Sequence, residues 1–207
     1  MAAMRPNSWP LAGFLTLALL LSACAGQVAR VPVESSWEEH RDRLQALTHW
    51  DASGKLALRT GELSESASLE WRQQGQRSTL QLSGPLGVNA TTVYNDGASL
   101  VIRQGEESRT LDLSDPQELE RRTGWDLPLQ ALPHWLKGVP APDLAVQQLA
   151  VGHDPSLLQA LRQDDWEIRY EQYADFDVYR LPTRLTIRRA ATTVRVIIRQ
   201  WQTGQAL

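Results

Sequence analysis

The chain has 207 residues, with 21 lysines and arginines against 24 aspartates and glutamates, which gives a formal net charge of -3. This length is typical of a single domain that can bury a sizeable core, and the slight acidity argues against nucleic acid as a partner. Cys24 is the one cysteine, so a disulfide within the chain is excluded and the fold must be held together by packing.

The first 23 residues have the features of an export signal. Arg5 precedes an uncharged apolar run from Leu11 to Leu21, which is too short to span a bilayer but has the length of a signal-peptide core. The run continues through Ser22 and Ala23 into Cys24, which is the pattern of a bacterial lipoprotein signal. We therefore predict a lipoprotein signal peptide that ends before Cys24. The alternatives are an uncleaved anchor or a cysteine that follows the run by accident.

The predicted acylation of Cys24 places the chain at a membrane, because two or more acyl chains anchor a protein stably. Ala25 and Gly26 follow the cysteine, so the aspartate that commonly signals inner-membrane retention is missing from the sequence there. We expect a lipid anchor in the outer membrane, with the chain facing the periplasm. Residues 24–35 are small, polar and broken by proline, which predicts a flexible tether, and residues 36–207 form the predicted domain.

One amphipathic helix opens the predicted domain. Ser36 and Glu39 have the spacing of a capping box, and apolar residues recur at helical spacing after them. This pattern predicts a helix from Trp37 to about Thr48.

Beyond Trp50 the apolar residues recur at every second position, which is typical of strands with one buried and one wet face. Glycine-containing turns separate several of these strands, and Asn95-Asp96-Gly97 is the strongest hairpin signal among them. The predicted strands are centred on residues 56–58, 67–71, 80–82, 88–94, 100–102, 109–113, 144–149, 166–170, 181–187 and 194–201. Short antiparallel strands joined by tight turns predict a mainly β (α+β) fold with a curled sheet or a barrel.

Two helical segments interrupt the predicted sheet. The first runs from Pro116 to Gly124 and the second from Pro128 to Lys137. Apolar side chains share one side of the second segment, so we expect it to plug something concave. Pro133 lies inside this segment and should kink the helix or restart it. A further helical turn is predicted after Pro155.

Sequence signatures of enzymes are absent. The four histidines, His40, His49, His134 and His153, are dispersed, and the sequence has neither a nucleophile elbow nor a phosphate-binding glycine loop. We therefore expect no catalysis, no metal and no cofactor. Apolar strand faces beneath an apolar helix favour a ligand cavity, but an ordinary β core would show the same alternation.

Several motifs resemble those of the LolB family of outer-membrane lipoprotein acceptors. These are the lipoprotein cysteine, the helix start Ser36-Trp37, and the stretches Leu69–Gln76, Leu80–Gly87 and Leu127–Gly138. Each motif is short, but their shared order covers nearly the whole mature chain. The sequence departs from the family pattern at Pro133 and in a longer, more basic ending from Arg184.

The resemblance implies a single-domain incomplete antiparallel β-barrel, wrapped around helices and enclosing an apolar cavity for the acyl chains of other lipoproteins. It also implies a partner, the soluble periplasmic carrier LolA, whose cargo would pass to this chain and then into outer-membrane lipid without a nucleotide. The Pro85-Leu86-Gly87 turn would form the membrane-insertion loop, with Leu86 protruding. The residues expected to line the cavity are Leu69, Trp71, Leu80, Leu82, Leu132, Trp135, Leu136 and Trp166.

Two other classes of protein stay open at this point. A structural or assembly lipoprotein would bind envelope proteins through exposed sheet edges without holding lipid. An envelope hydrolase would need polar groups that are distant in sequence to meet in the fold. Uptake of a fluorescent fatty-acid analogue would favour the carrier, whereas a filled and dry interior would favour the scaffold. For the carrier we expect a monomer.

Overall fold

One antiparallel sheet organises the described residues, which are 36–61, 63–85, 90–113 and 128–204 of the computed structural model. All of them belong to the unit that spans residues 31–207. The strands are β1 His49–Arg59, β2 Ser64–Gln74, β3 Arg77–Ser83, β4 Thr91–Asn95, β5 Ser99–Gln104, β6 Glu107–Asp112, β7 Val146–Val151, β8 Leu158–Gln163, β9 Trp166–Phe176, β10 Tyr179–Arg189 and β11 Thr192–Gln202.

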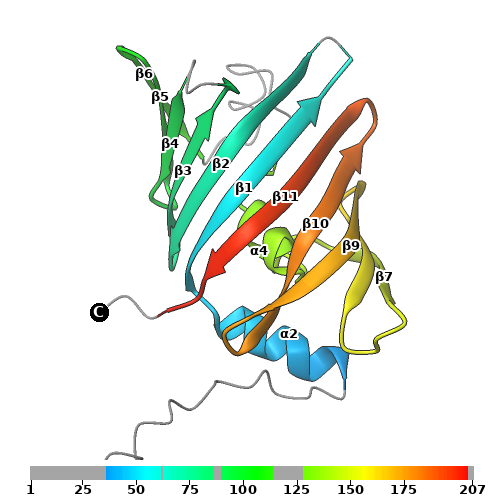
Figure 1. Ribbon diagram of the computed structural model, residues 1–207. Helices are drawn as coiled ribbons and strands as arrows, with labels where there is room; N and C mark the ends of the chain where they lie inside the picture. Colours follow the sequence, from blue (N-terminus) through cyan, green and yellow to red (C-terminus); the bar gives the residue numbers. More distant parts are fainter. Residues whose placement is uncertain (1–35, 62, 86–89, 114–127, 205–207) are drawn as a thin grey trace, which may run out of the picture. The chain divides into compact units, whose positions relative to one another are not determined.

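The strand order is β6-β5-β4-β3-β2-β1-β11-β10-β9-β8-β7 (Figure 1). Strands that follow one another in the chain lie side by side, apart from β6 and β7, and the pairing of β1 with β11 joins the two halves of the sheet. Strands β6 and β7 are the two ends of the sheet and are not paired with each other within the described residues. The sheet therefore curls without closing, which confirms the predicted incomplete barrel.

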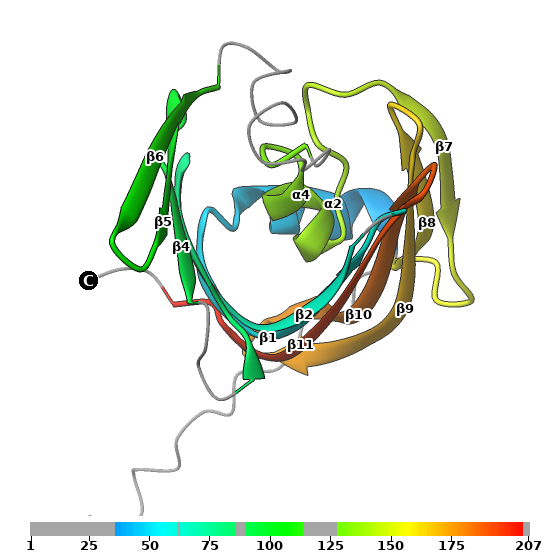
Figure 2. The same ribbon diagram turned by 90° about the horizontal axis from the view of Figure 1, so that it is seen from above.

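Two helices accompany the sheet in the described part of the chain. Helix α4 (Leu132–Lys137) lies on the concave side, and α2 (Trp37–Ala46) lies across one end of the sheet (Figure 2). No helix in these residues is long and apolar enough to cross a bilayer.

The start of α2 agrees with the predicted capping box. The Glu39 backbone N–H donates to Ser36 Oγ at 3.3 Å, although the helix ends at Ala46, two residues before the predicted Thr48. Pro133 lies in the first turn of α4, where a missing N–H costs nothing, so this proline restarts the helix and does not kink it.

The segment after Pro155 forms the predicted turn, but it also contains strand β8, which was not predicted. A single turn forms there, in which the Leu157 N–H donates to the Asp154 carbonyl at 3.1 Å, and β8 begins at the next residue. The leucines of this segment have a spacing that fits a helix, but pairing with β7 on one side and β9 on the other decides the conformation.

Four predicted features lie outside the described residues. They are the signal and Cys24, the tether over residues 24–35, the tip of the Pro85-Leu86-Gly87 turn, and the helix from Pro116 to Gly124.

A bulge joins the two halves of the sheet. Ser53 lies opposite Gln200, but Gly54 lies opposite Ile198, so β11 carries an extra residue at this point. The extra residue changes the phase of β11 and turns Trp201 to the buried side, opposite Ala52. Bulges also increase local twist, which favours the curl of the sheet.

Gly54 is required at this bulge because there is no room for a side chain. A Cβ at position 54 would collide with the carbonyl oxygen of Ile197 and would lie 2.9 Å from the Cα atom of Ile198. At Gly61, in contrast, a Cβ would meet nothing within 4 Å.

Gly54→Ala should lower the free energy of unfolding by about 2 kcal/mol or more, because backbone must move to admit the methyl group. Gly61→Ala is the matched control, and its free energy of unfolding should stay the same or rise by about 0.5 kcal/mol. Urea unfolding of both variants measures the difference. Equal stabilities would contradict the close approach of β1 and β11.

Candidate functional site

Helix α4 is fixed to the sheet by hydrogen bonds from buried polar groups. The Trp135 indole N–H donates to Gln163 Oε1 at 2.8 Å, and the Tyr170 hydroxyl donates to the Trp135 carbonyl at 3.0 Å. Gln163 is 0% exposed, and its Oε1 also accepts from the Ala141 N–H while its Nε2 donates to the Ala141 and Leu144 carbonyls. Because each of these polar groups has a partner, the helix is held in one position.

Lys137 links α4 to the end of α2. Its ammonium group donates to the carbonyl oxygens of Leu44 and Leu47 at 2.7 Å each, where the dipole of α2 favours a cation. Lys137 is 4% exposed, and burial lowers its pKa to about 8. The sequence gives no sign of this role, because the lysine and its acceptors are far apart in the chain.

A cleft of about 440 Å³ opens between α4, the connection from α2 to β1, and the turns that join β2 to β3 and β4 to β5. Trp50, Leu47 and Pro133 form apolar parts of its wall, and His134 and Lys137 contribute polar groups. Burial, followed by the charge of Lys137, lowers the pKa of His134 and so favours the neutral imidazole. This volume lies in the range of ligand pockets in proteins.

Two clusters of tryptophans lie in the core. The rings of Trp50 and Trp71 are 5.9 Å apart and those of Trp50 and Trp201 are 5.0 Å apart, between centroids. The rings of Trp135 and Trp166 are 6.1 Å apart. The sequence analysis missed Trp50 and Trp201 as members of the first cluster. Trp50 points to the same side of β1 as Ala52, so the alternation could have identified it. The side to which Trp201 points depends on the bulge, which the alternation does not show.

The eight residues predicted to line an acyl cavity all belong to the hydrophobic core or pack against it. Seven are buried and Leu82 is partly buried. Leu69 pairs across strands with Leu82 and Trp71 with Leu80, whereas Leu132, Trp135 and Leu136 come from α4 and Trp166 comes from β9. In the described part of the chain, the wall of the 440 Å³ cleft includes none of the eight. Their role as a cavity wall therefore stays a prediction.

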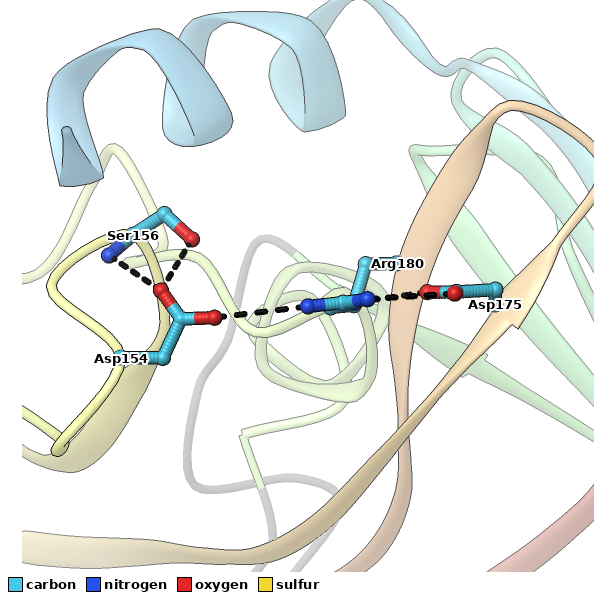
Figure 3. Close-up of polar contacts among 4 residues, drawn as sticks. All are labelled: Asp154, Ser156, Asp175 and Arg180. Atoms are coloured by element: carbon cyan, nitrogen blue, oxygen red, sulfur yellow. Dashed lines mark hydrogen bonds and ion pairs between the residues drawn. The ribbon is translucent and has the colours of Figure 1, made fainter. Parts of the chain in front are cut away.

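A polar cluster clamps the turn between β7 and β8 (Figure 3). Arg180 lies between two carboxylates, with Nε 2.6 Å from Asp175 Oδ1 and a terminal nitrogen 3.4 Å from Asp154 Oδ2. Ser156 Oγ donates to Asp154 Oδ1 at 2.7 Å. Hydrogen bonds, from Ser156 to Asp154 and from Arg180 to Asp175, lower the pKa of each carboxyl group. The serine hydroxyl thus donates to a carboxylate and not to an imidazole, which is the arrangement of a structural clamp and not of an activated nucleophile.

The curled open sheet with a helix on its concave side places this chain in a class of incomplete β-barrels. A solved LolA superfamily protein from Nitrosomonas europaea superposes with a TM-score of 0.52 at 10% identity, over 84% of this chain and 96% of that chain. At that identity the similarity shows a shared fold.

The sequence matches the family described as Outer membrane lipoprotein LolB over residues 48–201. The outer-membrane lipoprotein LolB of Chromohalobacter salexigens is 34% identical over 194 residues, which cover 91% of this chain and 88% of the relative. That of Alkalilimnicola ehrlichii is 38% identical over 191 residues, which cover 89% and 92%. The chain belongs to the LolB family of outer-membrane lipoproteins. The family and the outer-membrane location predicted from the sequence are thereby confirmed.

The ionisation of Lys137 should make stability depend on pH. Its pKa falls from the ordinary 10.5 to about 8 in the fold, so between these values the unfolded chain binds more protons and the free energy of unfolding rises with pH. Below pH 8 the lysine is charged in both states and contributes no slope. We expect urea unfolding of the wild type to show this rise between pH 8 and 10.5, and Lys137→Met should remove it.

Lys55→Met is the matched control, since Lys55 is exposed on β1 and its substitution should leave that rise in place. Identical pH profiles for the wild type and Lys137→Met would contradict the burial of a chargeable amine at this position.

Proposed function

We propose that this chain accepts lipoproteins from the soluble carrier LolA by taking up their acyl chains on its concave face, and then releases them into the outer membrane. Membership of the LolB family supports a role in lipoprotein localisation. Burying acyl chains against apolar side chains is worth roughly 25 cal/mol per Å². Transfer needs no nucleotide if each successive site holds the acyl chains more favourably than the last.

We base this function on the way α4 is attached. Leu132 and Leu136 are buried apolar residues of the helix, whereas its hydrogen bonds to other elements come from Trp135 and Lys137. Apolar contacts are not directional, so hydrocarbon can replace them without leaving a polar group unpaired. An acyl chain that entered along the cleft beside Pro133 would reach this apolar side of α4, while the hydrogen bonds keep the helix in place.

Trp71 provides a direct test of acyl uptake. Dibrominated stearate quenches indole emission on contact, so saturable quenching is expected when the acyl chain occupies the concave face. Trp71→Phe should lower the quenchable part of the emission. Trp37→Phe should leave it unchanged, because Trp37 has the same exposure of 6% but belongs to α2, outside the proposed wall. Absence of saturable quenching, or equal losses in the two variants, would count against this cavity.

Delivery into the bilayer tests the proposed role of Leu86. We expect Leu86→Glu to take up cargo normally but to deliver it to liposomes about tenfold more slowly, because a carboxylate resists entry into the apolar layer. Leu149→Glu is the control, since Leu149 is exposed by 38% on the end strand β7. Loaded carrier, the purified chain and liposomes supply the assay. Normal delivery by folded Leu86→Glu would remove this role.

A protein-binding scaffold is the second candidate, and strand β7 favours it. This end strand exposes Val146, Leu149 and Val151 at 50%, 38% and 41%, which suits the addition of a partner's strand. The quenching experiment separates the two functions, because a scaffold without a lipid site would show no saturable uptake of the brominated fatty acid.

A further inference from the structure

The convex face of the sheet carries a patch of positive charge where β1, β11 and β10 run side by side. We call it the basic face, and its members are Lys55, Arg59, Arg184, Arg188, Arg195 and Arg199. All six side chains are exposed, and along its strand each is next to an apolar residue that is buried or, for Lys55, partly buried. Within residues 55–59, 184–188 and 193–199 there is no aspartate or glutamate.

The strand register sets these charges in rows. From β1 through β11 to β10 the rows are Lys55–Ile197–Arg184, Ala57–Arg195–Thr186 and Arg59–Thr193–Arg188. Neighbouring strands lie about 4.8 Å apart, so two cations in a row are separated by about 10 Å, close to the Debye length at physiological salt. The six groups therefore repel one another when the face is empty.

None of the six cations forms an ion pair within the described residues. Carboxylates border the face on both sides: Glu70 of β2 lies diagonal to Lys55, and β9 carries carboxylates beside β10, with Glu167 directly opposite Arg188. Another carboxylate of β9, that of Glu171, accepts a hydrogen bond from Thr186 at 2.7 Å. The whole chain has a net charge of -3, so the part outside these six cations has a more negative net charge than the chain as a whole. The domain therefore has one face that an anionic surface attracts.

Ile197 indicates what kind of anionic surface fits. It is 41% exposed and lies between Lys55 and Arg184 in the first row. An apolar side chain surrounded by cations matches the boundary between headgroups and acyl chains in a bilayer, where cations meet phosphates and the apolar group enters the hydrocarbon.

We propose that the basic face binds the anionic phospholipids of the membrane to which the chain is anchored. An outer-membrane lipoprotein is held next to a bilayer, so weak contacts suffice because the anchor keeps the effective concentration high. Each basic residue near an anionic surface strengthens binding by about fivefold. Because α4 lies on the opposite side of the sheet (Figure 2), membrane contact through the convex face leaves the concave face open to the periplasm. The benefit of this orientation for cargo uptake rests on the proposed function, but the binding itself does not.

The experiment uses the full lipidated chain in vesicles of phosphatidylcholine, with or without phosphatidylglycerol. Acylation blocks Cys24, so Ile197→Cys supplies the one thiol for an environment-sensitive dye. On anionic vesicles we expect a blue shift and quenching by nitroxide lipids, and on neutral vesicles we expect neither. The response should vanish at 1 M salt, where the Debye length is about 3 Å. A dye at Tyr94→Cys is the control, since Tyr94 has the same 41% exposure but lies on β4.

Charge reversals identify the residues responsible. Arg195→Glu should weaken the response of the dye at position 197 by more than about tenfold, with Arg195→Gln intermediate. Arg77→Glu makes the same change of charge on an exposed residue of β3 and should leave the response unchanged. A dye at position 197 that stays in water on anionic vesicles would overturn the proposal, and so would equal effects of Arg195→Glu and Arg77→Glu. Fatty-acid quenching tests acyl uptake on the concave face in a separate experiment. Membrane binding by the basic face and acyl uptake can therefore be refuted independently.

Discussion

The attachment of α4 is the constraint on which the rest of the structure depends. An open sheet cannot hold its interior in place by closing around it, so the helix on its concave side needs directed contacts of its own. Gln163 and Tyr170 supply these from the sheet, and Lys137 extends them to the end of α2. Leu132, Pro133 and Leu136 contribute apolar surface, and His134 lines the cleft. A few hydrogen bonds therefore fix the position of α4, and its apolar contacts can be replaced by other apolar contacts without disturbing those bonds.

The bulge opposite Gly54 couples the curl of the sheet to the composition of its interior. It lies where β1 meets β11, which is the pairing that joins the two halves of the ladder. The same extra residue that increases the twist reverses the phase of β11, so Trp201 turns inward and its ring packs 5.0 Å from that of Trp50. A regular ladder would have put this tryptophan on the convex side. One irregularity thus contributes to both the curvature and the aromatic core.

Features governed by local chemistry were predictable from the sequence. The capping box of α2 was one, and the hairpin turns were another, since Gly75 and Gly97 adopt positive φ at the predicted positions. Ten of the strands were predicted, most of them from the alternation of the sequence, but β8 was not, because its leucines also fit a helix and only pairing on both sides selects a strand. The roles of Gln163 and Lys137 were equally hidden. Their partners are up to 93 residues away in the sequence, and the periodicity of apolar residues gives no information on contacts between such distant residues.

Net charge describes this molecule poorly, because its two faces have different chemistry. A total of -3 argues against a polyanion partner for the chain as a whole, yet residues 55–59, 184–188 and 193–199 of three adjacent strands present cations and no carboxylate on the convex side. Along each strand, buried apolar residues of the concave side alternate with these charges, so one period-two pattern generates both faces. Since successive side chains point to opposite sides, a substitution such as Arg195→Glu changes the outer face and leaves Val194 and Val196 in the core. The proposed contact with a membrane and the proposed holding of cargo are therefore compatible, because they use opposite sides of the same backbone.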